Sequence, residues 1–140
     1  MEKQIRYTLK KEDRLKSRKI IEHLFKDGKT VNIFPLRIFY LLSSSTEENK
    51  TNKLQAGFSA STRNFKKAVD RNRIKRLLRE SYRLQKHDLG EQLKISDKYL
   101  SVFFVYNGNE LPDYKTVYEK MQSSIKRLQK ILNESGITNI

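Results

Sequence analysis

Residues 63–86 read R-N-F-K-K-A-V-D-R-N-R-I-K-R-L-L-R-E-S-Y-R-L-Q-K, with ten basic side chains, two acidic ones and no Gly or Pro. Long side chains at this density favour helix. Apolar and small residues recur with helical spacing along one side, at Ile74, Leu77, Leu78, Ser81 and Tyr82. The opposite side carries Asn72, Lys75, Arg76, Arg79, Arg83 and Lys86. The pattern predicts a helix with a buried face and a cationic face, and Asn64 is its best N-cap candidate.

The cationic face is poorly suited to water alone. A solvated helix face, which is the alternative interpretation, usually interleaves the two signs of charge. Here Lys75/Arg79 and Arg79/Arg83 are like-charged i,i+4 pairs, and each costs about 0.2–0.5 kcal/mol. Arg predominates, and its planar guanidinium matches phosphate oxygens bidentately. The stretch therefore indicates an anionic partner, with phosphate as the favoured anion.

The same stretch has a recognisable motif. K-A-V-D-R-N-R-I-K-R-L-L-R-E, residues 67–80, closely resembles the signature of the bacterial ribonuclease P protein subunit, whose hallmark is the Arg-Asn-Arg triplet at residues 71–73. The resemblance extends through L-K-K-E-D-R-L (9–15), F-K-D-G-K (25–29) and G-F-S (57–59) to the last predicted helix. It covers most of the chain.

Length and composition favour one folded domain. We expect residues 1–140 to form a single RNA-binding domain with an ordered core of about residues 7–134. The net charge is +14 and the pI near 10.0, with 33% charged and 36% hydrophobic residues, which is typical of a folded domain with a cationic exterior. There is no Cys, and no signal-like or membrane-spanning apolar run. These features predict a cytoplasmic protein with no membrane partner.

The segments on either side of the basic stretch predict an α+β fold. A short helix should begin after Ser17, which is a plausible N-cap, and should end at Gly28. In this helix Ile20 and Leu24 should lie in the core, and Ile21 and Phe25 at the edge of the apolar stripe. Residues 1–14 should be extended before it, residues 43–52 should form a mobile loop, and residues 86–98 a polar connection containing Gly90. The expected strands are residues 30–34 (an edge, because Pro35 follows), 36–43, 54–60 (with a close approach at Gly57) and 99–106 (central), and a last helix should run from Asp113 to Gly136.

Together these elements predict a four-stranded mixed sheet with three helices. The resemblance to the ribonuclease P protein implies more, namely a fold like that of the second domain of ribosomal protein S5. That fold has a left-handed β-α-β crossover around the basic helix, whereas such crossovers are normally right-handed.

No catalytic or metal-binding constellation is visible in the sequence. His23 and His87 are isolated, Glu47 and Glu48 fall in the expected loop, and phosphate-loop, H-E-x-x-H and G-x-S-x-G motifs are missing. We expect no catalytic residue and no metal site in the protein. The resemblance agrees, because in that family the RNA subunit performs the hydrolysis and holds the Mg²⁺.

The resemblance also implies two binding surfaces. For the RNA subunit it implies Arg63, Lys66, Lys67, Arg71, Asn72, Arg73, Lys75, Arg76 and Arg79. For the single-stranded 5′ leader of precursor tRNA it implies a cleft lined by Ile21, Phe25 and Phe39, where aromatic rings can stack on unpaired bases. Ile21 departs from the aromatic residue of the family, and Thr62 departs from a basic one. For Phe39, a strand residue, burial in the core is the alternative.

The expected function is that of the accessory protein subunit of ribonuclease P, an endoribonuclease that uses Mg²⁺ to remove 5′ leaders in tRNA processing. Its partners would be the RNA subunit and precursor tRNA, with no DNA. One rival is a structural RNA-binding protein of the ribosome, against which the Arg-Asn-Arg-Ile-Lys-Arg string argues. The other is a self-sufficient nuclease, which would need a carboxylate or His cluster.

Overall fold

A four-stranded sheet organises the chain in the computed structural model, which describes residues 9–43, 53–96 and 98–138. The strands are β1 (Lys29–Ile33), β2 (Leu36–Ser43), β3 (Leu54–Ala60) and β4 (Tyr99–Tyr106), in the spatial order β1-β2-β4-β3. β4 pairs antiparallel with β2 and parallel with β3, and β1 pairs antiparallel with β2. The predicted mixed sheet, with residues 99–106 inside and the first strand at an edge, is confirmed.

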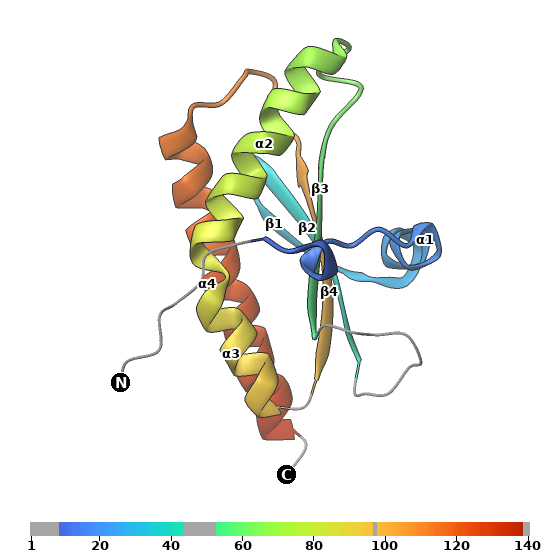
Figure 1. The fold of residues 1–140 in the computed structure, drawn as a ribbon, viewed down its shortest axis with the longest axis vertical. Helices are drawn as coiled ribbons and strands as arrows, with labels where there is room; N and C mark the ends of the chain where they lie inside the picture. Colours follow the sequence, from blue (N-terminus) through green and yellow to red (C-terminus); the bar gives the residue numbers. More distant parts are fainter. Residues whose placement is uncertain (1–8, 44–52, 97, 139–140) are drawn as a thin grey trace.

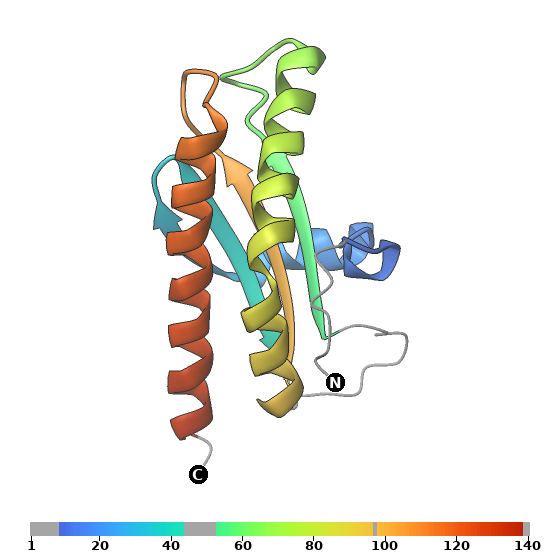
Figure 2. The ribbon, with the colours of Figure 1, turned by 60° about the vertical axis from the view of Figure 1, so that its left-hand side comes forward.

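Helices lie on both sides of the sheet. Figures 1 and 2 show α2 (Ala68–Gln85), α3 (His87–Ser96) and α4 (Tyr114–Thr138) on one side, and α1 (Arg18–Asp27) on the other. The short 3-10 helix η1 (Lys11–Asp13) lies beside β3, where the Leu15 N–H donates to the Ala56 carbonyl (2.9 Å). Residues 9–14, expected to be extended, thus contain a single turn of helix.

Alternation along the strands creates two apolar clusters. One set of strand residues, including Ile38, Ala56, Val102 and Phe104, packs under α2, α3 and α4 in the main core. The other set contains Phe39, Leu41, Phe103 and Val105, which pack with Leu15, Leu24, Ile20 and Ile21 beside α1. The first cluster stabilises the fold, and the second forms one side of a candidate site.

The ends of α1 are those that the sequence predicts. The Ser17 hydroxyl accepts a hydrogen bond from the Ile20 N–H (3.3 Å), and the Gly28 N–H donates to the Leu24 carbonyl (2.9 Å). Leu24 is fully buried, whereas Ile20 is half-buried and contributes less to the core than expected.

The basic helix begins later than predicted, at Ala68, and Asn64 is not its cap. The Asn64 amide instead donates to the carbonyls of Asn107 and Gly108, both at 3.1 Å, and ties the turn before α2 to the turn after β4. The neighbouring Phe65 is buried against Tyr106. These long-range contacts hold residues 61–67 out of the helix.

The polar connection predicted for residues 86–98 is wrong, because His87–Ser96 forms α3. Gly90 suggested a break, but Leu89 and Leu93, one turn apart, are completely buried. Gln92 also donates to the Gln129 carbonyl of α4 (2.9 Å). Tertiary burial therefore outweighs the low helix propensity of Gly90, and the described residues contain four α-helices instead of three.

The last helix starts as expected, with the Thr116 N–H bonded to the Asp113 carboxylate (2.9 Å). The predicted loop spans residues 43–52, but Ser43 still belongs to β2. The rest of that predicted loop, residues 44–52 with Glu47 and Glu48, lies outside the described residues, as do residues 1–8 of the predicted extended segment.

Gly57 provides a stability test, because the Phe103 ring covers it. A Cβ at Gly57 would lie 2.5 Å from Cδ2 and 2.6 Å from Cε2 of Phe103. Overpacking predicts that Gly57→Ala lowers the free energy of unfolding by about 1–3 kcal/mol, measured by urea titration.

The matched control is the same substitution at Gly90, where nothing lies within 4 Å of the added Cβ. Gly90→Ala should raise the free energy of unfolding by roughly 0.5–1 kcal/mol, since Ala is the better helix former. If Phe103 is the cause at Gly57, Phe103→Leu should cost less in the Gly57→Ala background than in the wild type. Equal costs would contradict the assigned contact.

Candidate nucleic-acid interface

The buried side of α2 orients its cations outward. Ile74, Leu78, Ser81 and Tyr82 are at most 1% exposed, and Leu77 is half-buried, as the spacing predicts. The basic residues on the opposite side of α2 must then point away from the sheet, on the outer side of the helix. The predicted sorting of the helix into two faces is confirmed.

The C-terminal part of this outer side is neutralised. The Arg83 guanidinium donates two hydrogen bonds to the Glu80 carboxylate, one turn earlier. This pairing lowers the pKa of Glu80 and raises that of Arg83. Farther along, the Lys86 ammonium lies 3.8 Å from the Asp13 carboxylate of η1. Arg83 and Lys86 are therefore less available to an external anion.

The remaining residues define the α2 cationic surface: Asn72, Arg73, Lys75, Arg76 and Arg79. Among the residues that the structure describes, no acid lies within ion-pairing distance of its four cations. Asn72, Arg73 and Arg76, with the exposed Val69, line an open depression of about 460 Å³. The surface combines unpaired charge with a hollow that an anionic group can enter.

Arg79 experiences the positive field of this surface directly. Partial burial lowers its pKa, and the nearby Arg14 and Arg76 lower it further. Arg14 comes from the segment that pairs with Ala56 of β3. No local pattern predicts that Arg14 lies beside α2, so the structure adds Arg14 to the candidate surface.

Arg71 differs from the other predicted RNA-binding residues because it has a structural task. One nitrogen of its guanidinium donates to the carbonyls of Phe65 and Lys66, both at 2.8 Å. It thereby anchors the turn before α2, where Arg63, Lys66 and Lys67 are exposed. The nine predicted residues thus lie along one continuous turn and helix, with Arg71 partly committed to holding that turn.

A second candidate surface lies on the other side of the sheet. Phe25 of α1 contacts Phe39 of β2 and Phe103 of β4 edge to face, with ring centroids 4.6 and 5.2 Å apart. We call Phe25, Phe39 and Phe103 the aromatic cluster. Phe25 is 45% exposed, Phe39 is half-buried and Phe103 is 8% exposed. The structure thus brings Phe25 and Phe39 together at a surface, and Phe103 supports them from beneath.

Sequence reasoning missed Phe103 and Arg37. The Arg37 guanidinium carbon lies 5.2 Å from the centroid of the Phe39 ring, a cation–π geometry. Strand alternation could have identified both residues. Arg37 and Phe39 are two positions apart and therefore lie on the same face of the sheet, and Phe103 lies on the opposite face from its neighbour Phe104, which is in the main core. Which strand positions meet across the sheet depends on the register, which pairs Phe39 with Phe103.

Ile21 is half-buried against the small cluster of Leu15, Leu24 and Phe103. It lies one turn from Phe25 on α1, so it borders the aromatic cluster as an aliphatic side chain. Thr62 is exposed in the turn before α2.

Within the described ranges, no group of three or more His, Asp or Glu side chains is arranged to hold a metal ion. His23 contacts the Asp27 carboxylate one turn later (3.2 Å). None of the helices in the described part is long and apolar enough to cross a membrane.

Comparison with known proteins agrees with this architecture. The family model Ribonuclease P matches residues 9–129. A ribonuclease P protein component of Porphyromonas gingivalis is 37% identical over 95% of both chains, and one of Chlorobium phaeobacteroides is 30% identical over 94% of this chain and 92% of the relative. The solved ribonuclease P protein of Thermotoga maritima superposes with a TM-score of 0.60 at 23% identity, covering 81% of this chain and 96% of that one, which shows a shared fold. By the extent of the family match and the identity to its members, the chain belongs to the ribonuclease P protein family.

Proposed function

We propose that this chain is the protein subunit of a ribonuclease P ribonucleoprotein, which removes 5′ leaders from precursor tRNA. It binds the catalytic RNA subunit through one surface and the leader through another. The observation that carries the proposal is that the α2 cationic surface and the aromatic cluster lie on opposite sides of one sheet. Two RNA segments can then be held at once without competing.

The α2 cationic surface suits an RNA helix. A-form RNA presents its phosphates and shallow minor groove to proteins, and its deep major groove excludes side chains. Arg73, Arg76 and Arg79 have no acidic partner among the residues that the structure describes, and they can give charge-assisted hydrogen bonds to phosphates. Arg63, Lys66 and Lys67 extend the same surface along the exposed turn. We assign this surface to the RNA subunit.

The aromatic cluster suits unpaired bases. Phe25 exposes nearly half of its surface, and Arg37 beside Phe39 adds a cation for the adjoining phosphate. Stacking on an aromatic ring contributes about 1–3 kcal/mol per base and tolerates different sequences. That tolerance fits a leader whose sequence varies from one precursor to another. Ile21 at the border packs against a base without stacking.

In this proposal, Mg²⁺ is bound by the RNA subunit and not by the protein. Among the described residues, no group of three or more His, Asp or Glu side chains is arranged to hold the ion, and the chain carries a net charge of +14, which repels cations. The ion therefore binds mainly to the RNA subunit, which supplies the hydrolytic chemistry. By covering phosphates, the protein lowers the charge that would otherwise have to be screened by free Mg²⁺.

A structural RNA-binding protein of the ribosome type would share the charge and the sheet, but it would not need a leader-binding cluster. The deciding experiment is cleavage of precursor tRNA by the cognate RNA subunit at low Mg²⁺, with and without this chain. Stimulation of cleavage supports the proposal, and an unchanged rate would favour the ribosomal alternative.

Neutralising two cations of the α2 surface should weaken binding to the RNA subunit. For Arg73→Gln/Arg76→Gln, the slope of log K against log salt concentration should flatten by about 1.4–1.8, because each lost phosphate contact removes roughly 0.7–0.9. The measurement is a salt titration of the affinity for the isolated RNA subunit. An unchanged slope would move the contact to another surface.

Arg71→Gln is a contrasting variant. It removes the hydrogen bonds to the Phe65 and Lys66 carbonyls, so the melting temperature should fall as well as the affinity. Lys94→Gln/Lys115→Gln, on α3 and at the start of α4, removes the same charge as the double Arg variant outside the candidate surface. That control should leave the slope unchanged.

Truncating the aromatic cluster should separate leader binding from stability. Phe25→Ala should reduce the affinity of the reconstituted holoenzyme for leader-bearing precursor by about five- to hundred-fold, with little effect on leaderless tRNA. Phe39→Ala should do the same with a larger fall in melting temperature, because it is more buried. The measurements are Kd for both tRNAs and the melting temperature of each variant.

Phe103→Ala provides the comparison for a core ring. Its truncation should cost about 3–5 kcal/mol of stability and impair both RNA contacts together. If Phe25→Ala melts normally and keeps the wild-type ratio of the two affinities, Phe25 does not contact the leader.

A further inference from the structure

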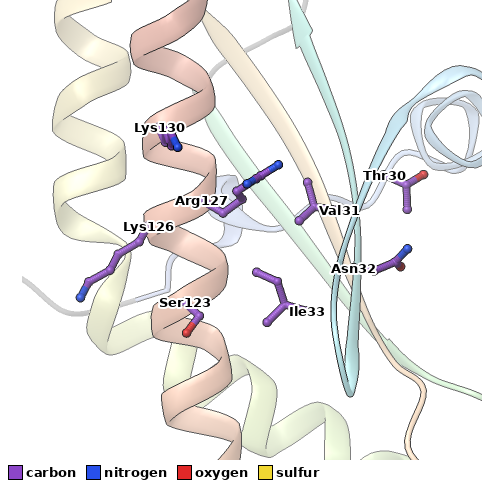
Figure 3. Close-up of a pocket in the computed structure, with 8 residues that line it drawn as sticks. All are labelled: Thr30, Val31, Asn32, Ile33, Ser123, Lys126, Arg127 and Lys130. Carbon is purple, nitrogen blue, oxygen red and sulfur yellow. The ribbon is translucent and has the colours of Figure 1, made fainter.

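A third surface lies at the β1 edge of the sheet. This edge is opposite the β3 edge, where α2 makes its contacts with the sheet. There, a groove of about 520 Å³ runs between β1 and α4, lined by Thr30, Val31, Asn32, Ile33, Ser123, Lys126, Arg127 and Lys130 (Figure 3). Val31 and Ile33 form an apolar floor that packs on the main core. Arg127 points from α4 toward Val31, as Figure 3 shows. We call this feature the α4–β1 groove.

The α4–β1 groove is cationic. Three of its eight lining residues are basic and none is acidic. In the described part of the chain, Lys126, Arg127 and Lys130 have no acid within ion-pairing distance. Glu134 is the nearby acid, since it and Arg127 both act electrostatically on the phenol of Tyr40. Positive charge therefore predominates in the α4–β1 groove itself, and Glu134 lies one helical turn beyond Lys130 on α4.

The strand side of the α4–β1 groove offers polar groups that suit a phosphate. β1 pairs with β2 alone among the described strands, so its outer edge presents backbone N–H groups without a strand partner. The side chains of Thr30 and Asn32 point away from α4, as Figure 3 shows, and lie on the sheet face that carries Phe39. Their exposed hydroxyl and amide groups therefore add donors between the aromatic cluster and the edge of β1. Side-chain hydroxyls, amides and backbone N–H groups, together with Arg and Lys, are the groups that proteins use to bind nucleic-acid phosphates.

The register connects the α4–β1 groove with the aromatic cluster. Thr30 of β1 is the direct cross-strand partner of Phe39 of β2. Neighbouring strands are about 4.8 Å apart. An extended strand of nucleic acid that continues from Phe39 toward the edge of the sheet would therefore contact Thr30 first and then the α4–β1 groove. An RNA strand is favoured over an acidic peptide, because the adjoining surface is aromatic and carries a cation, which is the combination that binds single-stranded nucleic acid.

We propose that the α4–β1 groove binds phosphates of the leader of precursor tRNA, in the part of the leader that lies beyond the aromatic cluster. The inference rests on the proposed function, since it needs the leader to reach Phe39. It adds a second leader-binding site, in which Arg127 and Lys130 neutralise two phosphates and β1 supplies neutral donors. The affinity for precursor tRNA then depends on leader length.

The test uses the reconstituted holoenzyme with Arg127→Gln/Lys130→Gln and with the Lys94→Gln/Lys115→Gln control. Leaders of about 4 and about 16 nucleotides bracket the site sizes of small single-strand-binding domains. For the long leader, the double variant should flatten the slope of log K against log salt by about 1.4, that is, roughly 0.7 per phosphate on a single strand. The short leader, the binding of the RNA subunit and the control variant should keep wild-type values.

The other outcomes separate the two proposals. If wild-type holoenzyme binds short-leader and leaderless tRNA equally, leader binding at the aromatic cluster fails, and the α4–β1 proposal falls with it. If leader dependence is present but the long-leader slope is unchanged in Arg127→Gln/Lys130→Gln, the α4–β1 proposal alone is overturned. Weakened binding of the isolated RNA subunit by the same variant would assign the groove to that RNA and would also overturn it.

Discussion

Three aromatic rings hold the basic helix on the sheet, and the orientation of every cation on α2 depends on them. Tyr82 of α2 lies 5.4 Å from Phe58 of β3 and 5.6 Å from Phe104 of β4, measured between ring centroids, and the two phenylalanines stack at 5.7 Å. Tyr82 and Phe104 are almost completely buried. Because this contact determines which side of α2 faces the sheet, it also determines which side presents Arg73, Arg76 and Arg79 to solvent.

The sheet separates two kinds of surface. The face covered by α2, α3 and α4 carries most of the apolar burial and therefore most of the stability. The other face, beside α1, carries a smaller cluster in which rings remain partly exposed, and the missing side chain of Gly57 leaves space for the Phe103 ring that Phe25 contacts edge to face. A fold that is stabilised on one face can keep aromatic side chains available on the other.

Charge pairing divides the basic side chains into those that serve the fold and those that remain for a partner. Arg83 and Lys86 are paired with acids, and Arg71 donates to backbone carbonyls. The cations of the α2 surface and of the α4–β1 groove lack such pairs among the described residues. Surface ion pairs contribute little to stability, so leaving these cations unpaired costs the fold little and favours association with a polyanion.

The sequence alone determined the class of the fold, the ranges of β2, β3 and β4, the two faces of α2 and the family, because strand alternation, helical periodicity and the Arg-Asn-Arg motif are local patterns. It placed the first strand one residue too late, since β1 is Lys29–Ile33. It placed Phe25 and Phe39 as candidates for one site, and their contact agrees. Tertiary structure decided the rest. Long-range hydrogen bonds removed Asn64 from the cap, burial of Leu89 and Leu93 made a helix across Gly90, and strand register brought Phe103 under Phe39 and Thr30 beside it. Each of these depends on partners distant in the chain, which no local pattern specifies.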